Sequence, residues 1–416
     1  MYLDEIVTAQ RRGEARGIAS ICSAHPHVIK QTLDTFEHPL IEATCNQVNQ
    51  FGGYTGMKPK DFFAYVQGIA KENNFPFENI ILGGDHLGPN VWRNEPARLA
   101  MEKSKVLIRD YVEAGFTKIH LDCSMRLADD PQGVVDVEII AKRAAQLAKV
   151  AEETFSSSRD GDRGRKLRYV IGTEVPIPGG ATEHETTLRV TEVKEARRTI
   201  EVTRDAFLEA GLESAWKRVV GVVVQPGVEF GDDFVLPYEP KAARELSKFI
   251  ESQPMVYEAH STDHQSRRSL KNMVCDHFAI LKVGPSLTFA FREAVFALAM
   301  IENELVVQEE RSNLIQVLED AMLKYPSHWK DYYRGTEDEQ TFKRKFSLSD
   351  RARYYWVQPE IQEALTRLMR NLGRTPLPYA LLSQFVGKKN LSATQVIEQK
   401  LKYVLDGYSR ACNEKH

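Results

Sequence analysis

The chain has 416 residues, enough for one large domain or two of ordinary size. A hydrophobic content of 42% and a charged content of 27% indicate a soluble globular protein. The formal net charge of -3 gives no reason to expect nucleic acid or an anionic membrane as a partner, and no apolar run of about 18 residues predicts a membrane span.

The N-terminal stretch MYLDEIVTAQRRGEARG is polar and helical in pattern, unlike a secretory signal. The cysteines are odd in number, widely spaced and contain no CxxC motif, which favours reduced thiols over a disulfide framework or a structural zinc site. We therefore expect a cytoplasmic protein.

Short apolar runs rich in β-branched residues recur through the first two thirds of the chain. Most are continuous rather than alternating, which is typical of strands buried on both faces. They span residues 17–25, 39–47, 80–86, 116–124, 168–176, 219–227, 255–263 and 278–286. Helical patterns lie between them, for example at 96–115, where Gly115 stands at a C-cap position, and at 136–155.

Eight strands alternating with helices predict an α/β fold of the (β/α)8 TIM-barrel type. A doubly wound open sheet is the alternative, because it shares the alternating pattern. The barrel is favoured because nearly every predicted strand ends in a polar group, and only a barrel brings all of those ends to one mouth. These groups are His25, Glu42, Asp85, His86, Asp122, Glu174, Gln225, His260, Asp263 and Lys282.

No strand pattern follows residue 300. We therefore predict a barrel over 1–300 and a C-terminal helical extension over 301–416 packed on it. The aromatic segments of the extension, YPSHWKDYYRG and SLSDRARYYW, are interpreted as packing surfaces rather than a nucleotide site.

The stretch IILGGDHLGPNVW carries an acid and an imidazole side by side at a predicted strand end. Adjacent strand residues point to opposite faces, but at a strand end both can reach a barrel mouth. Imidazole is a common ligand of divalent transition metals, and a neighbouring carboxylate can act as acid or base. We therefore expect His86 to bind a metal ion and Asp85 to take part in catalysis.

Two further strand ends complete a predicted metal site. His260 in YEAHSTD and Glu174 in VIGTEVPIPGG supply a second imidazole and a carboxylate, so His86, Glu174 and His260 form an open site. Asp122 and Glu174 are predicted catalytic carboxylates beside Asp85. Gln225 and Glu258 are supplementary groups, whereas His120, inside its strand, is expected to be packed or hydrogen-bonded.

The stretch KVGPSLTFAFREA leads a strand into a helix whose first turn offers free N–H groups, the usual phosphate site of such barrels. A simple strand–helix turn is an equal alternative.

Two glycine-rich loops, at 49–57 and 175–183, are expected over the mouth. No GxxxxGK[ST] or GxGxxG motif supports nucleotide binding. The residues predicted to bind substrate are His25, Glu42, Asn46, Gln225, Asp263, Lys282 and Ser286.

Long motifs throughout the chain, among them ILGGDHLGPN, KIHLDCSM, YVIGTEVPIPGG, YEAHSTD and HFAILKVGPSLTFAFREA, resemble the GatZ/KbaZ family. Cys45 and Ser286 depart from the family pattern, in which Ser and Ala are common at these two positions. The resemblance implies a metal-bearing barrel related to class II aldolases, with Asp85 as catalytic acid and His86 and His260 as metal ligands. The ion would be zinc, manganese or nickel.

The family resemblance implies three functions. The first is a 4-epimerase that interconverts tagatose and fructose or their 6-phosphates, by retro-aldol cleavage or, as an alternative route, hydride transfer. The second is a non-catalytic subunit that stabilises a separate catalytic subunit of class II tagatose-1,6-bisphosphate aldolase. A sugar-phosphate kinase ranks last. A small-molecule ketohexose or its phosphate, a catalytic aldolase subunit and further copies of the chain are the expected partners.

Overall fold

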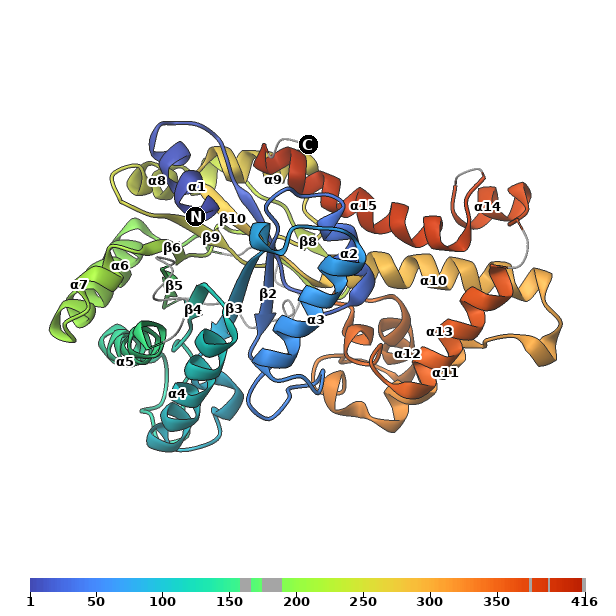
Figure 1. Cartoon of the computed structure of the whole chain (residues 1–416), viewed down its shortest axis with the longest axis horizontal. Coiled ribbons are helices and arrows are strands. Elements are labelled where there is room, and N and C mark those ends of the chain that lie inside the picture. Colours follow the sequence, from blue (N-terminus) through green and yellow to red (C-terminus); the bar gives the residue numbers. More distant parts are fainter. Residues whose placement is uncertain (158–165, 174–188, 374–375, 388–389, 414–416) are drawn as a thin grey trace.

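The computed structural model describes residues 1–157, 166–173, 189–373, 376–387 and 390–413 (Figure 1). Its centre is a closed barrel of eight parallel strands, ordered β1-β10-β9-β6-β5-β4-β3-β2. These strands are β1 (Ile18–Ile21), β2 (Leu40–Thr44), β3 (Ile81–Leu87), β4 (Lys118–Leu121), β5 (Arg168–Gly172), β6 (Val219–Val223), β9 (Val256–Ala259) and β10 (Phe278–Val283).

Each barrel strand coincides with one of the apolar runs in the sequence. Nearly every residue in them is buried, because the barrel interior covers one face and the surrounding helices cover the other. The predicted (β/α)8 fold is therefore confirmed.

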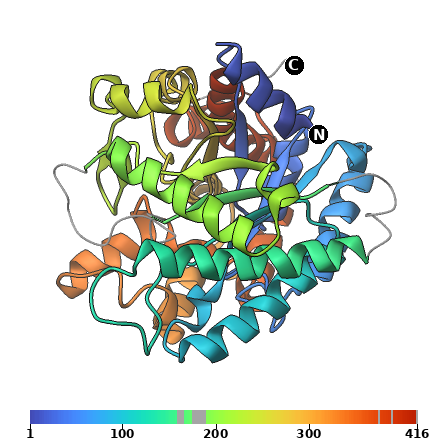
Figure 2. The same cartoon turned by 90° about the vertical axis from the view of Figure 1, so that its left-hand side faces the viewer.

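Helices surround the barrel. They are α1 (Tyr2–Arg11), α2 (Pro26–Leu33), α3 (Pro59–Glu72), α4 (Ala97–Ala114), α5 (Val137–Ser156), α6 (Val193–Glu209), α7 (Glu213–Trp216), α8 (Pro240–Ile250), α9 (Arg267–Cys275) and α10 (Pro285–Leu305). As predicted, α4 ends at Gly115, whose φ of 100° is left-handed. Figure 2 shows α5 and α6 lying side by side across one flank of the barrel.

The amino-terminal ends of the strands are closed by apolar packing. Leu3 and Ile6 of α1 lie in a buried cluster with the first residues of several strands, including Ile18, Leu40 and Ile81. Because apolar side chains fill the barrel interior at this end, the candidate site is sought at the opposite, carboxyl-terminal end.

The segment after α10 is helical, as expected. Its elements are η4 (Gln308–Glu310), α11 (Leu314–Lys324), η5 (Pro326–His328), α12 (Glu337–Phe346), η6 (Arg351–Tyr354), α13 (Pro359–Leu372), α14 (Tyr379–Phe385) and α15 (Ala393–Cys412). Its apolar side chains share one continuous core with the barrel. The predicted boundary between barrel and extension at residue 300 falls within α10, and it stays a prediction.

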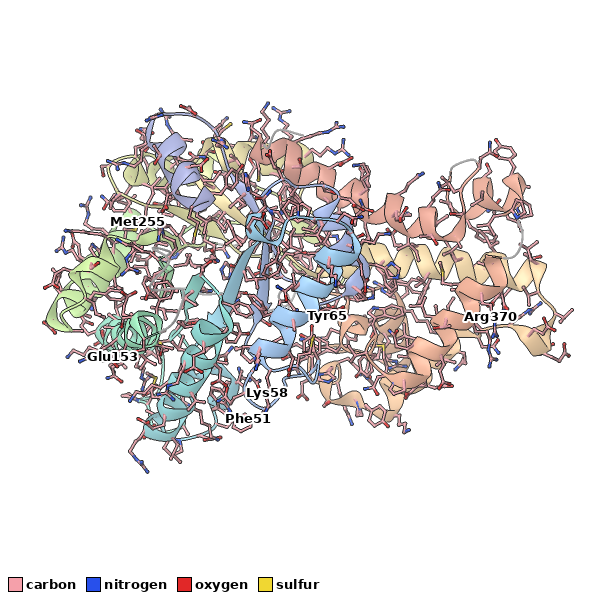
Figure 3. The ribbon with its side chains drawn as sticks, viewed as in Figure 1. Phe51, Lys58, Tyr65, Glu153, Met255 and Arg370 are labelled. Carbon is pink, nitrogen blue, oxygen red and sulfur yellow. The ribbon has the colours of Figure 1, made fainter. Side chains whose placement is uncertain are left out.

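Two contacts bring the extension back to the barrel. Helix α15 packs along α9 and α10, and the Gly17 N–H, just before β1, donates to the Cys412 carbonyl over 3.0 Å. On the other side, Tyr65 of α3 stands toward the extension (Figure 3), and with Trp356 it lines a cavity between the two. A two-stranded hairpin, β7 (Glu229–Phe230) and β8 (Val235–Leu236), was not expected from the sequence.

Among the residues that the structure describes, no helix combines the length and the apolar character that crossing a bilayer requires.

Candidate metal centre and active site

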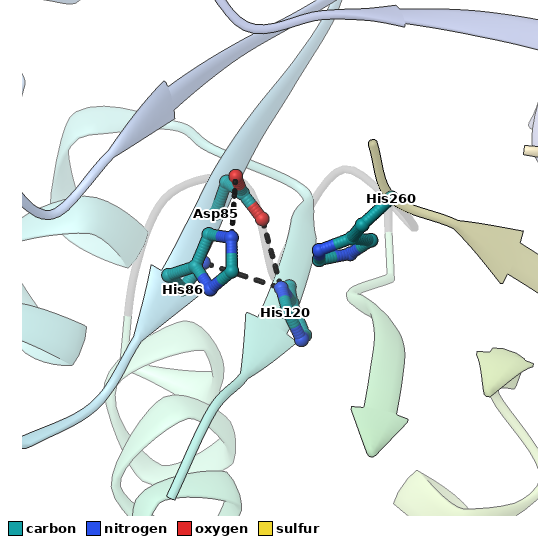
Figure 4. A group of neighbouring side chains, drawn as sticks. All are labelled: Asp85, His86, His120 and His260. Atoms are coloured by element: carbon teal, nitrogen blue, oxygen red, sulfur yellow. Dashed lines mark hydrogen bonds and ion pairs between the residues drawn. The ribbon is translucent and has the colours of Figure 1, made fainter. Parts of the chain in front are cut away.

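Four side chains converge at the carboxyl-terminal end of the barrel: Asp85 and His86 from β3, His120 from β4 and His260 just after β9 (Figure 4). One potential ligand atom from each lies within 4.8 Å of the others, and all four residues are buried. The ring centroids of the three histidines are 5.0–5.3 Å apart. The predicted convergence of His86 and His260 is therefore seen in the structure, with His120 added.

The local sequence of β3 explains how Asp85 and His86 come to share one site. His86 has a left-handed backbone with φ of 49°, so the usual alternation of side chains is broken and both residues line the same cavity. This conformation is unfavourable for a non-glycine residue, and the surrounding structure must stabilise it.

Glycines on either side of the pair allow close packing. A Cβ on Gly83 would lie 2.3 Å from Oε1 of Glu42, and one on Gly88 would lie 1.7 Å from the carbonyl oxygen of Asp122. Gly83 thus leaves room for an acid in the barrel interior, and Gly88 lets the end of β3 approach the end of β4.

Each of the three imidazoles has one ring nitrogen directed at a carboxylate. Nδ1 of His86 lies 2.8 Å from Oδ2 of Asp122. Nδ1 of His120 lies 2.8 Å from Oδ1 of Asp85, and Nε2 of His260 lies 3.0 Å from Oε1 of Glu258. For His86 and His260 such carboxylate–histidine pairs fix the ring orientation and leave the second nitrogen for a metal ion. Nδ1 of His120 also accepts a hydrogen bond from the His86 N–H over 3.2 Å. Nε2 of His120 is buried and has no hydrogen-bond partner within the described part of the chain.

Burial and charge together set the protonation of these groups. Burial lowers the pKa of His260 to about 3, so this ring is neutral and carries a free lone pair. For Asp85, burial raises the pKa, but His86, Lys282 and His120 outweigh it and hold the pKa well below its usual value. Asp85 is therefore an ionised carboxylate. For His86, burial opposes the attraction of Asp85 and Asp122, which prevails and raises the pKa.

A buried network of lysines and glutamates lies beneath the imidazoles. Lys118 Nζ lies 2.5 Å from Oε1 of Glu42 and 2.6 Å from Oε2 of Glu258. Lys282 Nζ pairs with Asp85 and, over 3.2 Å, with Oε2 of Glu42. Removing one member of such a network leaves an unpaired buried charge, so these residues hold Asp85 and Glu258 in fixed positions.

A cavity of about 90 Å³ opens over the cluster. Of the predicted site residues, it brings together Asn46, Asp85, His86, His260, Asp263 and Lys282. Tyr54, from the glycine-rich loop at 49–57, also lines this cavity, as do Arg353 and Tyr354 from the extension. The site is thus a joint product of the barrel and the extension.

The structure places five other predicted residues elsewhere. Asp122 stands behind His86, where it orients the ring, and Glu42 lies in the buried network beneath. Gln225 accepts hydrogen bonds from the N–H groups of Gly227 and Val228 in its own turn. His25 lines the neighbouring cavity. Ser286 faces a separate groove between α10 and α15.

Glu174, predicted as both ligand and catalytic carboxylate, lies outside the described residues, as does the loop at 175–183.

The first turn of α10 differs from the expected phosphate site. Oδ1 of Asp263 accepts hydrogen bonds from the N–H groups of Gly284 over 3.0 Å and of Ser286 over 2.8 Å. Because a carboxylate already occupies the helix N-terminus, an anion meets no free N–H there in this structure. Lys282, its expected counter-charge, is paired with Asp85 and Glu42.

The expected buried, hydrogen-bonded position of His120 is confirmed by its contact with Asp85, but the sequence interpretation left His120 out of the donor set and did not anticipate Arg353. For His120 a signal was present: His120 and Asp122 are two residues apart, so they share the inward face of β4. For Arg353 there was none, because only the packing of the extension brings η6 to the mouth.

The donor set fits a divalent transition metal. Three imidazoles and one carboxylate are typical zinc, manganese or nickel ligands, and the rings of His86 and His260 are each oriented by an acid outside this set. The set does not distinguish among these ions.

Comparison with known proteins places the chain among sugar-metabolism relatives. A D-tagatose-1,6-bisphosphate aldolase subunit GatZ from Salmonella paratyphi B is 51% identical over 99% of each chain. The crystal structure of a probable tagatose 6 phosphate kinase from Sinorhizobium meliloti superposes with a TM-score of 0.87 at 44% identity, covering 95% of this chain and all of that one. The fructuronate-tagaturonate epimerase UxaE from Cohnella laeviribosi shares the fold, with a TM-score of 0.52 at 10% identity, over 96% of this chain and 82% of that one.

A family model described as D-tagatose-1,6-bisphosphate aldolase subunit GatZ/KbaZ-like matches residues 3–413. This chain therefore belongs to the GatZ/KbaZ-like family.

Proposed function

We propose that this chain serves as the GatZ/KbaZ-type subunit of a tagatose-1,6-bisphosphate aldolase and works with a separate catalytic subunit. The supporting observation is the 51% identity to a protein named as that subunit, over 99% of both chains. Identity at this level over the full length favours the same role in sugar metabolism. It favours the subunit role over independent epimerisation as the first function to test.

The test is co-expression with a class II catalytic aldolase subunit. We expect the two chains to elute together from a sizing column, and the catalytic subunit to keep its aldolase activity longer at elevated temperature than it does alone. Separate elution together with unchanged inactivation kinetics would contradict the proposal.

A second candidate function is favoured by the site itself. A subunit that only stabilises a partner has no need of three oriented imidazoles, an ionised acid and a buried lysine network at one cavity. These groups suit inversion at C4 of a ketohexose or its 6-phosphate, which would convert tagatose and fructose forms into each other.

Inversion at C4 requires a route around a carbon without an acidic proton, and retro-aldol cleavage of the C3–C4 bond provides one. Asp85, being ionised, would accept the C4 hydroxyl proton and return it after the aldehyde fragment has rotated. A divalent ion held by His86, His120 and His260 would supply Lewis-acid stabilisation of the negative charge that develops on the C2 oxygen. Lys282, paired with Asp85, fixes the orientation of that carboxylate.

The epimerase candidate is tested with the purified chain alone. Fructose, tagatose and their 6-phosphates are supplied with a divalent metal, and the configuration at C4 is followed by NMR. Turnover that is lost in His86→Ala and His260→Ala, but kept in His38→Ala outside the site, would support catalysis. If the wild-type chain converts none of the sugars with any of the metals, the epimerase candidate is contradicted and the subunit role is the one that stands.

A further inference from the structure

A second cavity, of about 280 Å³, adjoins the one over the histidine cluster. Both are lined by Cys22, Gln47, Tyr54, Gly284 and Arg353. The first, at about 90 Å³, is small beside the roughly 300–1,000 Å³ of typical ligand pockets. A sugar whose reacting carbons lie against Asp85 and His86 would therefore reach into the second cavity.

Two residues that line the second cavity carry buried polar atoms without partners. Nδ1 of His25 and Nε1 of Trp356 are buried, and neither has a hydrogen-bond partner among the described residues. A buried polar group without a partner destabilises the fold, so such groups point to a ligand or a bound water. The Trp356 N–H can only donate, which favours a ligand rich in acceptor oxygens.

Arg353 stands at the junction of the two cavities. Its Nη1 donates to the carbonyls of Ser349 and Asp350, and its Nη2 donates to the Tyr354 hydroxyl over 3.0 Å. Within the described ranges, no carboxylate forms an ion pair with this guanidinium. The carboxylate of Asp350 is instead paired with Arg292, at 2.6 Å.

A second arginine adds to the positive charge behind the cavities. Arg351 is buried and stacks on the ring of Tyr332, with its guanidinium carbon 3.1 Å from the ring centroid. It too forms no ion pair with an acid in the described part of the chain. The two guanidinium groups therefore contribute positive charge on this side of the site.

The segment that carries Arg353 is fixed to the barrel. Nη2 of Arg292, on α10, donates to the Ser347 carbonyl over 2.8 Å, and the Leu348 N–H donates to the Asp232 carbonyl over 2.8 Å. His264 lies 3.0 Å from the Leu348 carbonyl. Because these contacts hold η6 in place, the position of Arg353 is set before any ligand arrives.

We propose that the second cavity binds the phosphate at the far end of a ketose phosphate, and that Arg353 selects phosphorylated over free sugar. This rests on the proposal that the barrel mouth binds a ketose. The Nε–H and the second Nη2–H of Arg353 have no partner among the described residues and can donate to phosphate oxygens. Trp356, which lines the same cavity, carries a further unpaired donor. The extension would thus contribute substrate selection, while the barrel carries the reactive groups.

Binding, measured by calorimetry in the presence of Mn²⁺, tests the proposal without relying on turnover. We expect Arg353→Gln to weaken fructose 6-phosphate binding at least tenfold and to change fructose binding less than twofold. Arg334→Gln, exposed on the same extension, is the matched control and should change neither. Trp356→Phe, which keeps the aromatic ring but removes the donor, should weaken only the phosphorylated sugar.

Arg353→Lys guards against a folding defect in the glutamine variant, because it keeps the positive charge and removes the planar fork. We expect its affinity for fructose 6-phosphate to lie between those of wild type and Arg353→Gln. Equal losses for both sugars, no loss, or failure of the wild-type chain to bind fructose 6-phosphate would each overturn the phosphate subsite. Binding that depends on Arg353 without any turnover would overturn the epimerase candidate alone.

Discussion

Nδ1 of His120 lies 2.8 Å from Oδ1 of Asp85, the acid that begins the Asp85–His86 pair. The two residues stand on neighbouring strands, so the barrel register itself brings them together. This contact makes His120 part of the candidate metal centre and gives Asp85 a fixed direction.

The first prediction concerns metal content. His86→Ala and His120→Ala should each lower the affinity for zinc or manganese at least tenfold, because each removes one imidazole from a buried set of four donors. Elemental analysis after dialysis against the metal, together with competition by a chelator, measures the change. His38→Ala is the control, and equal metal content in all four proteins would show that the cluster holds no ion.

A second prediction concerns Asp122, which orients the ring of His86 without being a metal ligand itself. Asp122→Asn keeps the size of the side chain but removes the charge that holds Nδ1 of His86 at 2.8 Å. Metal affinity should fall about 10–100-fold, as for other carboxylates that orient metal-binding histidines. The exposed Asp205→Asn provides the comparison. Unchanged affinity in Asp122→Asn would mean that this carboxylate does not orient a metal ligand.

A third prediction tests the close approach of β3 and β4. Gly88→Ala places a Cβ 1.7 Å from the Asp122 carbonyl oxygen, which the backbone can relieve only by moving the end of β3. We expect a loss of at least about 3 kcal/mol in the free energy of unfolding. Urea unfolding followed by tryptophan fluorescence measures it.

The matched substitution is Gly68→Ala, on the exposed face of α3, where a Cβ meets nothing within 4 Å. Alanine is the better helix former, so this variant should gain about 0.5–1 kcal/mol. Similar effects of the two substitutions would contradict the account of β3.

A fourth prediction concerns pH. Arg143 donates two hydrogen bonds to the Asp130 carboxylate, of 2.8 Å and 2.5 Å, and these lower the pKa of Asp130 below its ordinary value of 3.8. A lowered pKa means that the pair stabilises the fold fully above the unfolded-state value and loses that contribution as the pH falls through the folded-state value.

Asp130→Asn should therefore cost about 1.5–3 kcal/mol at pH 7. That difference from wild type should be constant down to about pH 5 and shrink below about pH 4. Urea unfolding at each pH measures both proteins, with the exposed Asp205→Asn expected to cost under about 0.5 kcal/mol throughout. A difference that grows on acidification would contradict the assigned sign.

The barrel was predictable because buried parallel strands leave continuous apolar runs, and the ends of those runs carry the polar groups. That pattern located Asp85, His86 and His260 correctly at one mouth. Strand position alone could not separate Gln225, which folds into its own turn, from Asn46, which lines the cavity. The distinction depends on turn geometry and side-chain direction, which a single strand pattern does not encode.

The sequence did not indicate that residues of the C-terminal extension would line the site. Arg353 lies in a segment whose sequence indicates only helix and aromatic packing, and its place over the barrel depends on contacts with Asp232, His264 and Arg292. The short hairpin β7–β8, which lies next to one of those contacts, has two-residue strands that leave no periodic signal.

The hydrogen bond between Gly17 and Cys412 has a consequence for biosynthesis. Helix α15 covers β1 and α2, yet the ribosome produces it only after every barrel strand. The nascent chain therefore carries an uncovered apolar flank throughout most of its translation. That flank can be closed only after the C-terminal helix has been synthesised.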